Sequence, residues 1–157
     1  MGNVAIEAVI LAPLLVVQII LFPFVANSLA SNWANATRDI TLKELASQMA
    51  STIQQLYLSL NRPEVSAGNI TQTSTFPKEI SGHPYDAIGL LNDSFQLGLG
   101  KVLFLNVTLQ DLGNTVMVQT PLGPNVLWKE ESVFASSSPN ASIRVQKFVN
   151  GTLLFSF

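Results

Sequence analysis

The chain has 157 residues, of which 48% are hydrophobic and only 11% are charged, against roughly 25% charged residues in an average soluble domain. The net charge of −2 excludes a basic nucleic-acid-binding protein, because there is no excess of cations to neutralise phosphates. The absence of cysteine excludes disulfide scaffolds, thiolate metal sites and cysteine nucleophiles, and a single histidine argues against a histidine-based metal site. We therefore expect neither enzyme activity nor a metal or organic cofactor.

The N-terminal segment is apolar along nearly its whole length. Glu7 is the only ionisable side chain before Arg38, and only four of the residues in Val4–Ala26 are not apolar. Such a run is long enough to cross the ~30 Å hydrocarbon core of a bilayer as a helix. A cleaved secretory signal would have a basic start and an apolar core of about 7–15 residues, and this segment has neither. We interpret the segment as part of the working protein.

The helical pattern continues beyond the apolar run. Apolar residues between Leu42 and Leu60 recur at spacings of three, one and four, which is typical of one apolar helix stripe. Asn61-Arg62-Pro63 then ends the helix, because proline disfavours helical geometry in the residue before it. The predicted division is a helix over residues 1–61, hydrophobic at 4–29 and amphipathic at 30–60, followed by an outer domain over residues 62–157.

Two prolines, Pro13 and Pro23, lie inside the predicted helix. Each removes one backbone hydrogen bond and favours a kink. Prolines are also common in membrane helices, where they are tolerated. Two alternatives therefore stay open, a tolerated proline or a functional local unwinding of the helix.

The second part of the chain has the alternating pattern of β-strands. Residues 101–110 are predicted to form a strand, with Val107 and Leu109 on one face and Asn106, Thr108 and Gln110 on the other. After a turn, residues 115–120 form the returning strand, and residues 126–134 form a third predicted strand. Asn150-Gly151 separates two further runs and predicts a hairpin with a type I′ turn. The sequence thus predicts an α+β fold, in which a long hydrophobic N-terminal helix precedes an all-β domain that is sandwich-like and Ig-like.

Asn-X-Ser/Thr sequons are unusually frequent. Composition alone predicts roughly two, whereas the chain has six with a non-proline middle residue. N-linked glycans would require these sites to be exposed in an extracytoplasmic compartment, and would keep a weakly charged chain soluble. The alternative is that a surface rich in Asn, Ser and Thr produces the motif by composition. The expected sites are Asn35, Asn69, Asn92, Asn106, Asn140 and Asn150.

The positions of the basic residues and of the sequons predict opposite orientations of the chain in a membrane. Arg38 and Lys43 follow the apolar run and no basic residue precedes it, so the positive-inside rule places the β domain in the cytoplasm. The sequons place the same domain outside. The conflict disappears if a basic leader once preceded Met1 and has been removed.

The N-terminal residues resemble the type IV pilin superfamily. The run Asn3–Leu15 has a glutamate at Glu7, a short apolar spacer and then Pro13, which resembles archaeal adhesive pilins and is also similar to Tad-type pilin-like proteins. The resemblance implies a prepilin peptidase, and cleavage after Gly2 would make Glu7 the fifth mature residue. Met-Gly alone is not a basic leader, so the sequence departs from the family pattern there. The resemblance is specific over about 30 residues and only architectural beyond them.

The resemblance implies a structural protein of an extracellular pilus filament used for adhesion. The N-terminal helices would form the filament core, Glu7 would pair with the N-terminal amine of a neighbouring subunit to set the register, and glycosylated β domains would form the outer surface. The implied partners are other copies of the chain, an assembly ATPase and a membrane platform protein, with the subunit in the membrane before assembly. The alternatives are a single-pass surface protein with a ligand-binding β domain, and a membrane-tethered enzyme.

Overall fold

The computed structural model describes residues 2–73, 75–92 and 100–157, with only the backbone described for residues 2–12. The chain divides into two compact units. The N-terminal unit is Met1–Thr37 and the C-terminal unit is Arg38–Phe157.

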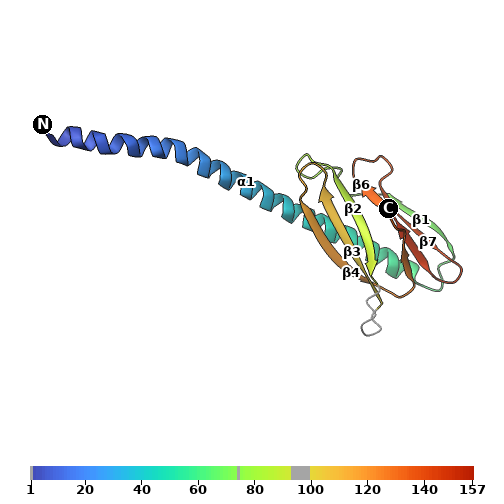
Figure 1. Cartoon of the computed structure of the whole chain (residues 1–157). Coiled ribbons are helices and arrows are strands. Elements are labelled where there is room, and N and C mark those ends of the chain that lie inside the picture. Colours follow the sequence, from blue (N-terminus) through green and yellow to red (C-terminus); the bar gives the residue numbers. More distant parts are fainter. Residues whose placement is uncertain (1, 74, 93–99) are drawn as a thin grey trace. The chain divides into compact units, whose positions relative to one another are not determined.

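A single α-helix, α1, runs from Gly2 to Leu60 (Figure 1). The helix continues through Pro13 and Pro23, although neither residue has an N–H to bond the carbonyl four residues earlier. The backbone is helical at both prolines, and a functional unwinding at either one stays a prediction from the sequence. The helix ends just before Asn61-Arg62-Pro63, where the sequence places its end.

The boundary between the two compact units lies within α1, between Thr37 and Arg38, whereas the predicted boundary lies at the end of the helix. The observed boundary lies earlier because the second half of α1 has side chains that are buried among the strands. From Leu42 onward the apolar stripe of α1 lies in the same hydrophobic core as the strands, so this part of the helix belongs to the C-terminal unit.

The described residues of the C-terminal unit form eight strands in two four-stranded sheets. The sheet orders are β1-β7-β8-β5 and β4-β3-β2-β6, and all pairings are antiparallel except the parallel pair β5 and β8. This arrangement confirms the α+β class with a sandwich-like β domain. The strands are β1 (Gly68–Thr73), β2 (Tyr85–Asn92), β3 (Lys101–Leu109), β4 (Thr115–Leu122), β5 (Val126–Trp128), β6 (Val133–Ala135), β7 (Ser142–Lys147) and β8 (Leu153–Ser156).

The predicted third strand over residues 126–134 is wrong as a single element. It is divided into β5 and β6, which lie in different sheets. Between them the backbone turns, with the Ser132 N–H donating to the Lys129 carbonyl at 3.4 Å and Glu131 at a φ of 59°. This positive φ is incompatible with an extended strand, so the run is interrupted between β5 and β6.

The predicted hairpin at Asn150-Gly151 forms between β7 and β8, but its turn is not of type I′. In this turn only Gly151 has a positive φ, of 82°, whereas type I′ needs two such residues. The Gly151 N–H donates to the Phe148 carbonyl at 3.0 Å, and the Phe148 N–H donates to the Thr152 carbonyl at 2.9 Å. These bonds define a three-residue loop whose glycine takes the left-handed position.

The core of the C-terminal unit joins α1 to both sheets. One cluster packs Leu42, Ala46 and Met49 against β2, β3 and Phe134 of β6. A second cluster packs Ile53 and the following helical turns against side chains of β3, β7 and β8. This half of α1 therefore lies on the apolar faces of the strands and completes their burial.

Candidate functional site

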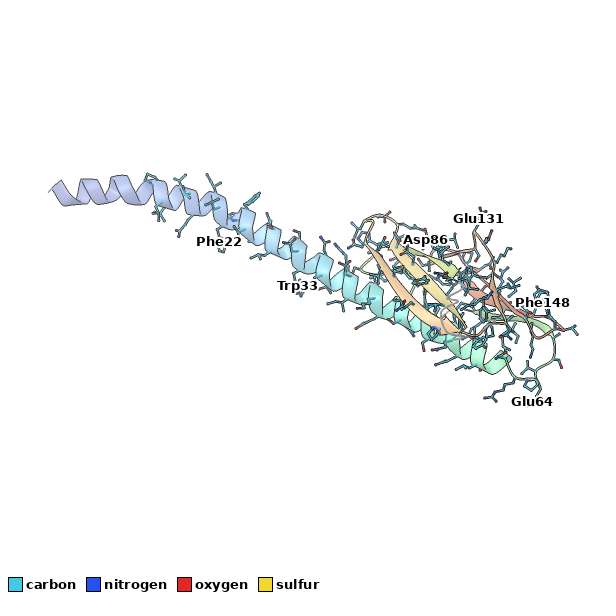
Figure 2. The ribbon with its side chains drawn as sticks, turned by 60° about the horizontal axis from the view of Figure 1, so that its bottom comes forward. Phe22, Trp33, Glu64, Asp86, Glu131 and Phe148 are labelled. Carbon is cyan, nitrogen blue, oxygen red and sulfur yellow. The ribbon has the colours of Figure 1, made fainter. Side chains whose placement is uncertain are left out.

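The N-terminal unit presents apolar side chains that it does not bury. From Pro13 to Trp33 every side chain is exposed, and Figure 2 shows Phe22 and Trp33 projecting from the helix surface. Phe22 is 76% exposed and Trp33 is 75% exposed. Within the part of the chain whose side chains are described, one helix is long and apolar enough to span a membrane. Such a helix suggests membrane insertion.

A regular seam of apolar residues follows this helix. The residues alternate at spacings of four and three, which is the 3.5-residue repeat of helices that pack side by side. Between Asn27 and Thr37 the only large apolar side chains are Leu29 and Trp33, and both belong to the seam. The pattern is not among the sequence predictions above, although the spacing of these apolar residues can be read from the sequence alone. We define the helix seam as Leu15, Ile19, Phe22, Ala26, Leu29, Trp33 and Ala36.

The same spacing continues to Ile40 in the C-terminal unit. Ile40 is 61% exposed, whereas Leu42, two residues later, is fully buried. In this unit one face of α1 therefore packs into the hydrophobic core, and the face that carries Ile40 is exposed.

The predicted register residue, Glu7, lies within α1, as does the predicted cleavage residue, Gly2. The Glu7 side chain lies outside the described residues. Its pairing with a neighbouring amine stays a prediction from the sequence.

The end of α1 is held to the β domain by a polar network. The Asn61 Nδ2 donates to the Tyr57 hydroxyl at 2.9 Å, and that hydroxyl lies 3.3 Å from Asn125 Oδ1. Asn125 Nδ2 donates to Asn61 Oδ1 at 2.7 Å and to the Gly151 carbonyl at 2.8 Å. Burial of the Tyr57 hydroxyl raises its pKa above the ordinary value. The network ties the helix end to the β7–β8 turn.

Five of the six predicted glycosylation sites have exposed asparagines. Asn106 differs, because it is half-buried in the central strand β3. Its Oδ1 atom is buried and has no hydrogen-bond partner among the described residues. The sequon of Asn92 extends to Ser94, which lies outside the described residues. The exposed asparagines are Asn35, Asn69, Asn92, Asn140 and Asn150.

Asn35 lies on the same helix as the seam but on another face. At 3.6 residues per turn it is about 200° around the helix from Trp33. A glycan on Asn35 would therefore leave the seam open to a neighbouring helix.

No family model, curated protein or solved structure matches this chain. The likeness of the N-terminal residues to type IV pilins thus stays a prediction from the sequence. Two features bear on function, namely the membrane-length apolar helix with its seam and the sandwich-like β domain that follows it in sequence.

Proposed function

We propose that this protein is the structural subunit of an extracellular, type IV pilus-like filament used for attachment to surfaces. The observation that supports this proposal is that the helix seam extends beyond the apolar run that spans the bilayer. Val4–Ala26 alone is long enough to span a bilayer, yet Leu29 and Trp33 continue the exposed seam beyond it. Lipid covers the first part, and a partner helix is needed to cover the second.

Copies of the same helix fit this seam best. Outside the membrane, burying a Leu or Phe side chain stabilises an assembly by about 1.5–3 kcal/mol. A 3.5-residue apolar repeat favours an α-helix as the occupant, because its side chains interlock with a second such repeat. Within the membrane the gain is smaller, since lipid is already apolar. Removal of the subunit from the membrane therefore requires work, which an assembly ATPase acting with a membrane platform protein would supply.

Glu7 would set the axial register of the filament. A carboxylate inside an apolar bundle is costly unless a cation pairs with it, and a neighbour's N-terminal amine, freed by prepilin peptidase, would provide that cation. A misaligned neighbour leaves the charge unpaired. The pair would thus act mainly as a register device.

The outer surface would carry N-linked glycans. Five sequon asparagines are exposed, and the chain has few charges to keep it soluble. Glycosylation also requires the β domain to reach an extracytoplasmic compartment, as a surface filament does.

Sedimentation of sheared cell-surface material tests the proposal. We expect the chain to pellet without detergent and to form filaments in electron micrographs. Glu7→Gln should abolish the polymer while the membrane still contains the subunit. Glu64→Gln, which removes an exposed carboxylate of the C-terminal unit, is the matched control and should assemble normally.

A second candidate is a single-pass surface protein whose β domain binds a ligand as a monomer. Trp33 supports this alternative, because tryptophan is common near membrane interfaces. This protein would remain with the membrane until detergent releases it, and Glu7→Gln would have no effect on its state. That outcome would replace the filament proposal.

A further inference from the structure

The outward face of the sheet β1-β7-β8-β5 carries an open groove. Strands β1 and β7 lie side by side in Figure 1, and their register aligns outward side chains across β1, β7 and β8. The groove has a volume of about 530 Å³, within the range of ligand sites. Two rows of side chains cross it, namely Thr71–Arg144–Ser156 and Asn69–Gln146–Leu154.

A second hollow of about 200 Å³ lies next to the groove. Thr71 and Arg144 line both hollows, so the Arg144 side chain lies where they meet. Two open, adjoining hollows suit an extended chain of linked units better than one small molecule.

The groove is cationic. Arg144 and Lys129 line it, and among the described residues no acidic side chain lines either hollow. The Arg144 Nε donates to the Ser142 hydroxyl at 3.4 Å. Within the described part of the chain, the terminal nitrogens of Arg144 and the Lys129 ammonium have no hydrogen-bond or ion-pair partner. These groups are available to an anion.

The remaining polar groups match a hydroxyl-rich ligand. Thr71 and Ser156 supply hydroxyl groups, and Gln146 supplies both a donor and an acceptor. A planar guanidinium binds carboxylate or sulfate through two parallel hydrogen bonds, and the Lys129 ammonium adds a second charge. The combination favours an anionic sugar chain.

We propose that this groove binds an acidic polysaccharide, that is, a sugar polymer with carboxylate or sulfate groups. The proposal names the class of surface to which the filament attaches, and it rests on the proposed function in that respect. Arg144 binds the anionic group at the junction of the hollows, while the hydroxyl and amide groups bind sugar hydroxyls.

Two sequon asparagines lie at the proposed site, because Asn69 lines the groove and Asn140 lines the second hollow. A glycan at either position would cover part of the site, so the proposal requires both asparagines to be free of glycan in the filament. Peptide mass mapping of the native chain tests this requirement, and an occupied Asn69 or Asn140 would overturn the proposal. Binding is tested with the full-length Asn69→Gln/Asn140→Gln chain, in which no glycan is attached at these positions.

Binding is measured with the detergent-solubilised full chain, so assembly is not required. The probes are immobilised polygalacturonate, which has carboxylates, chondroitin sulfate, which has carboxylates and sulfates, and dextran, which is neutral. We expect both acidic polymers to bind at least about tenfold more tightly than dextran, with affinity falling as salt rises. The stronger of the two acidic polymers identifies the preferred anion.

Matched variants assign the binding to the groove. Arg144→Gln should weaken binding of the acidic polymers about tenfold to a hundredfold, which is the expected loss of a charge-assisted bidentate contact. Lys129→Gln should weaken it less, because an ammonium makes a single point contact. Lys78→Gln changes the net charge equally at an exposed site outside the groove, and should leave the affinity unchanged.

The proposal is overturned if dextran binds as tightly as the acidic polymers, or if Arg144→Gln binds like the parent chain. Equal losses in Arg144→Gln and Lys78→Gln would also overturn it, since they would indicate a general charge effect. Each result leaves the filament proposal standing, because assembly is measured separately by sedimentation.

Discussion

The Lys147 ammonium lies 2.8 Å from the carbonyl oxygen of Leu60, the last residue of α1. It also donates to the Arg62 carbonyl at 2.7 Å, and the side chain is only 9% exposed. The last carbonyls of a helix have no partner within the helix and carry partial negative charge. A lysine on β7 therefore caps the helix and joins it to the sheet.

Replacing this lysine should destabilise the C-terminal unit. Lys147→Met keeps the apolar stem but leaves two inward carbonyl oxygens without their donor. We expect the free energy of unfolding to fall by about 1–3 kcal/mol. Urea unfolding of the detergent-solubilised full chain measures it. Lys78→Met, at an exposed lysine, is the control, and an equal loss in both variants would contradict the capping role.

Gly123 approaches the Tyr57 hydroxyl so closely that a Cβ atom there would overlap it. Gly123→Ala should therefore push Tyr57 out of its network and lower the free energy of unfolding by about 1–3 kcal/mol. The control is Gly68→Ala, because a Cβ at Gly68 has no neighbour within 4 Å. If urea unfolding shows the two variants to be equally stable, the close contact has no energetic importance.

The helix seam predicts a defect in assembly without a defect in membrane insertion. Leu29→Gln places a polar amide within the seam but beyond the bilayer-length run. We expect insertion to be normal and the sedimenting polymer to be strongly reduced, because the amide loses water on burial. Ser31→Gln puts the same amide about 200° around the helix and should assemble. Normal filament yield from Leu29→Gln would show that the seam is not a contact.

The raised pKa of Tyr85 predicts that the C-terminal unit becomes less stable at high pH. The Tyr85 hydroxyl donates to the Pro77 carbonyl at 2.8 Å, and burial raises its pKa to about 12. In the unfolded chain the pKa is about 10. Stability is thus fully present below pH 10, and is lost as pH rises from 10 towards 12, by up to about 1.4 kcal/mol per pH unit.

The Tyr85→Phe variant provides the comparison. It should be less stable near pH 8 by about 1 kcal/mol, because the hydrogen bond to Pro77 is gone. Its stability should then fall less steeply than that of the parent between pH 10 and 12. Identical slopes in thermal or urea unfolding would remove Tyr85 as the titrating group.

Glycan occupancy should differ among the six sequons. Asn106 is half-buried within β3, whereas the other five asparagines are exposed. If transfer occurs on the folded domain, Asn106 has a lower occupancy than the exposed Asn35, Asn92 and Asn150, since it is half-buried within β3. Peptide mass mapping measures each site. An intact mass equal to the 17.0 kDa polypeptide would contradict glycosylation altogether.

Local patterns determined much of the architecture. The apolar run and the stripe from Leu42 to Leu60 predict one helix, alternation predicts the inward Val107 and Leu109 of β3, and Asn150-Gly151 predicts the β7–β8 hairpin. Such features depend on neighbours a few residues apart, whose spacing is fixed by helix and strand geometry. The helix seam was equally readable, since a 3.5-residue repeat is a property of spacing alone.

Tertiary structure decided what depends on distant residues. Periodicity cannot indicate that residues 126–134 divide between two sheets, because both pieces are locally strand-like and only the partner strands β8 and β2 separate them. Likewise, Lys147 reads as an exposed strand residue until the end of α1 supplies its carbonyls. The groove around Arg144 exists only because pairing brings β1 beside β7, strands more than sixty residues apart along the chain. Local sequence thus determined α1, β3, β4 and the β7–β8 hairpin, and long-range packing decided the partners of the strands and the division between β5 and β6.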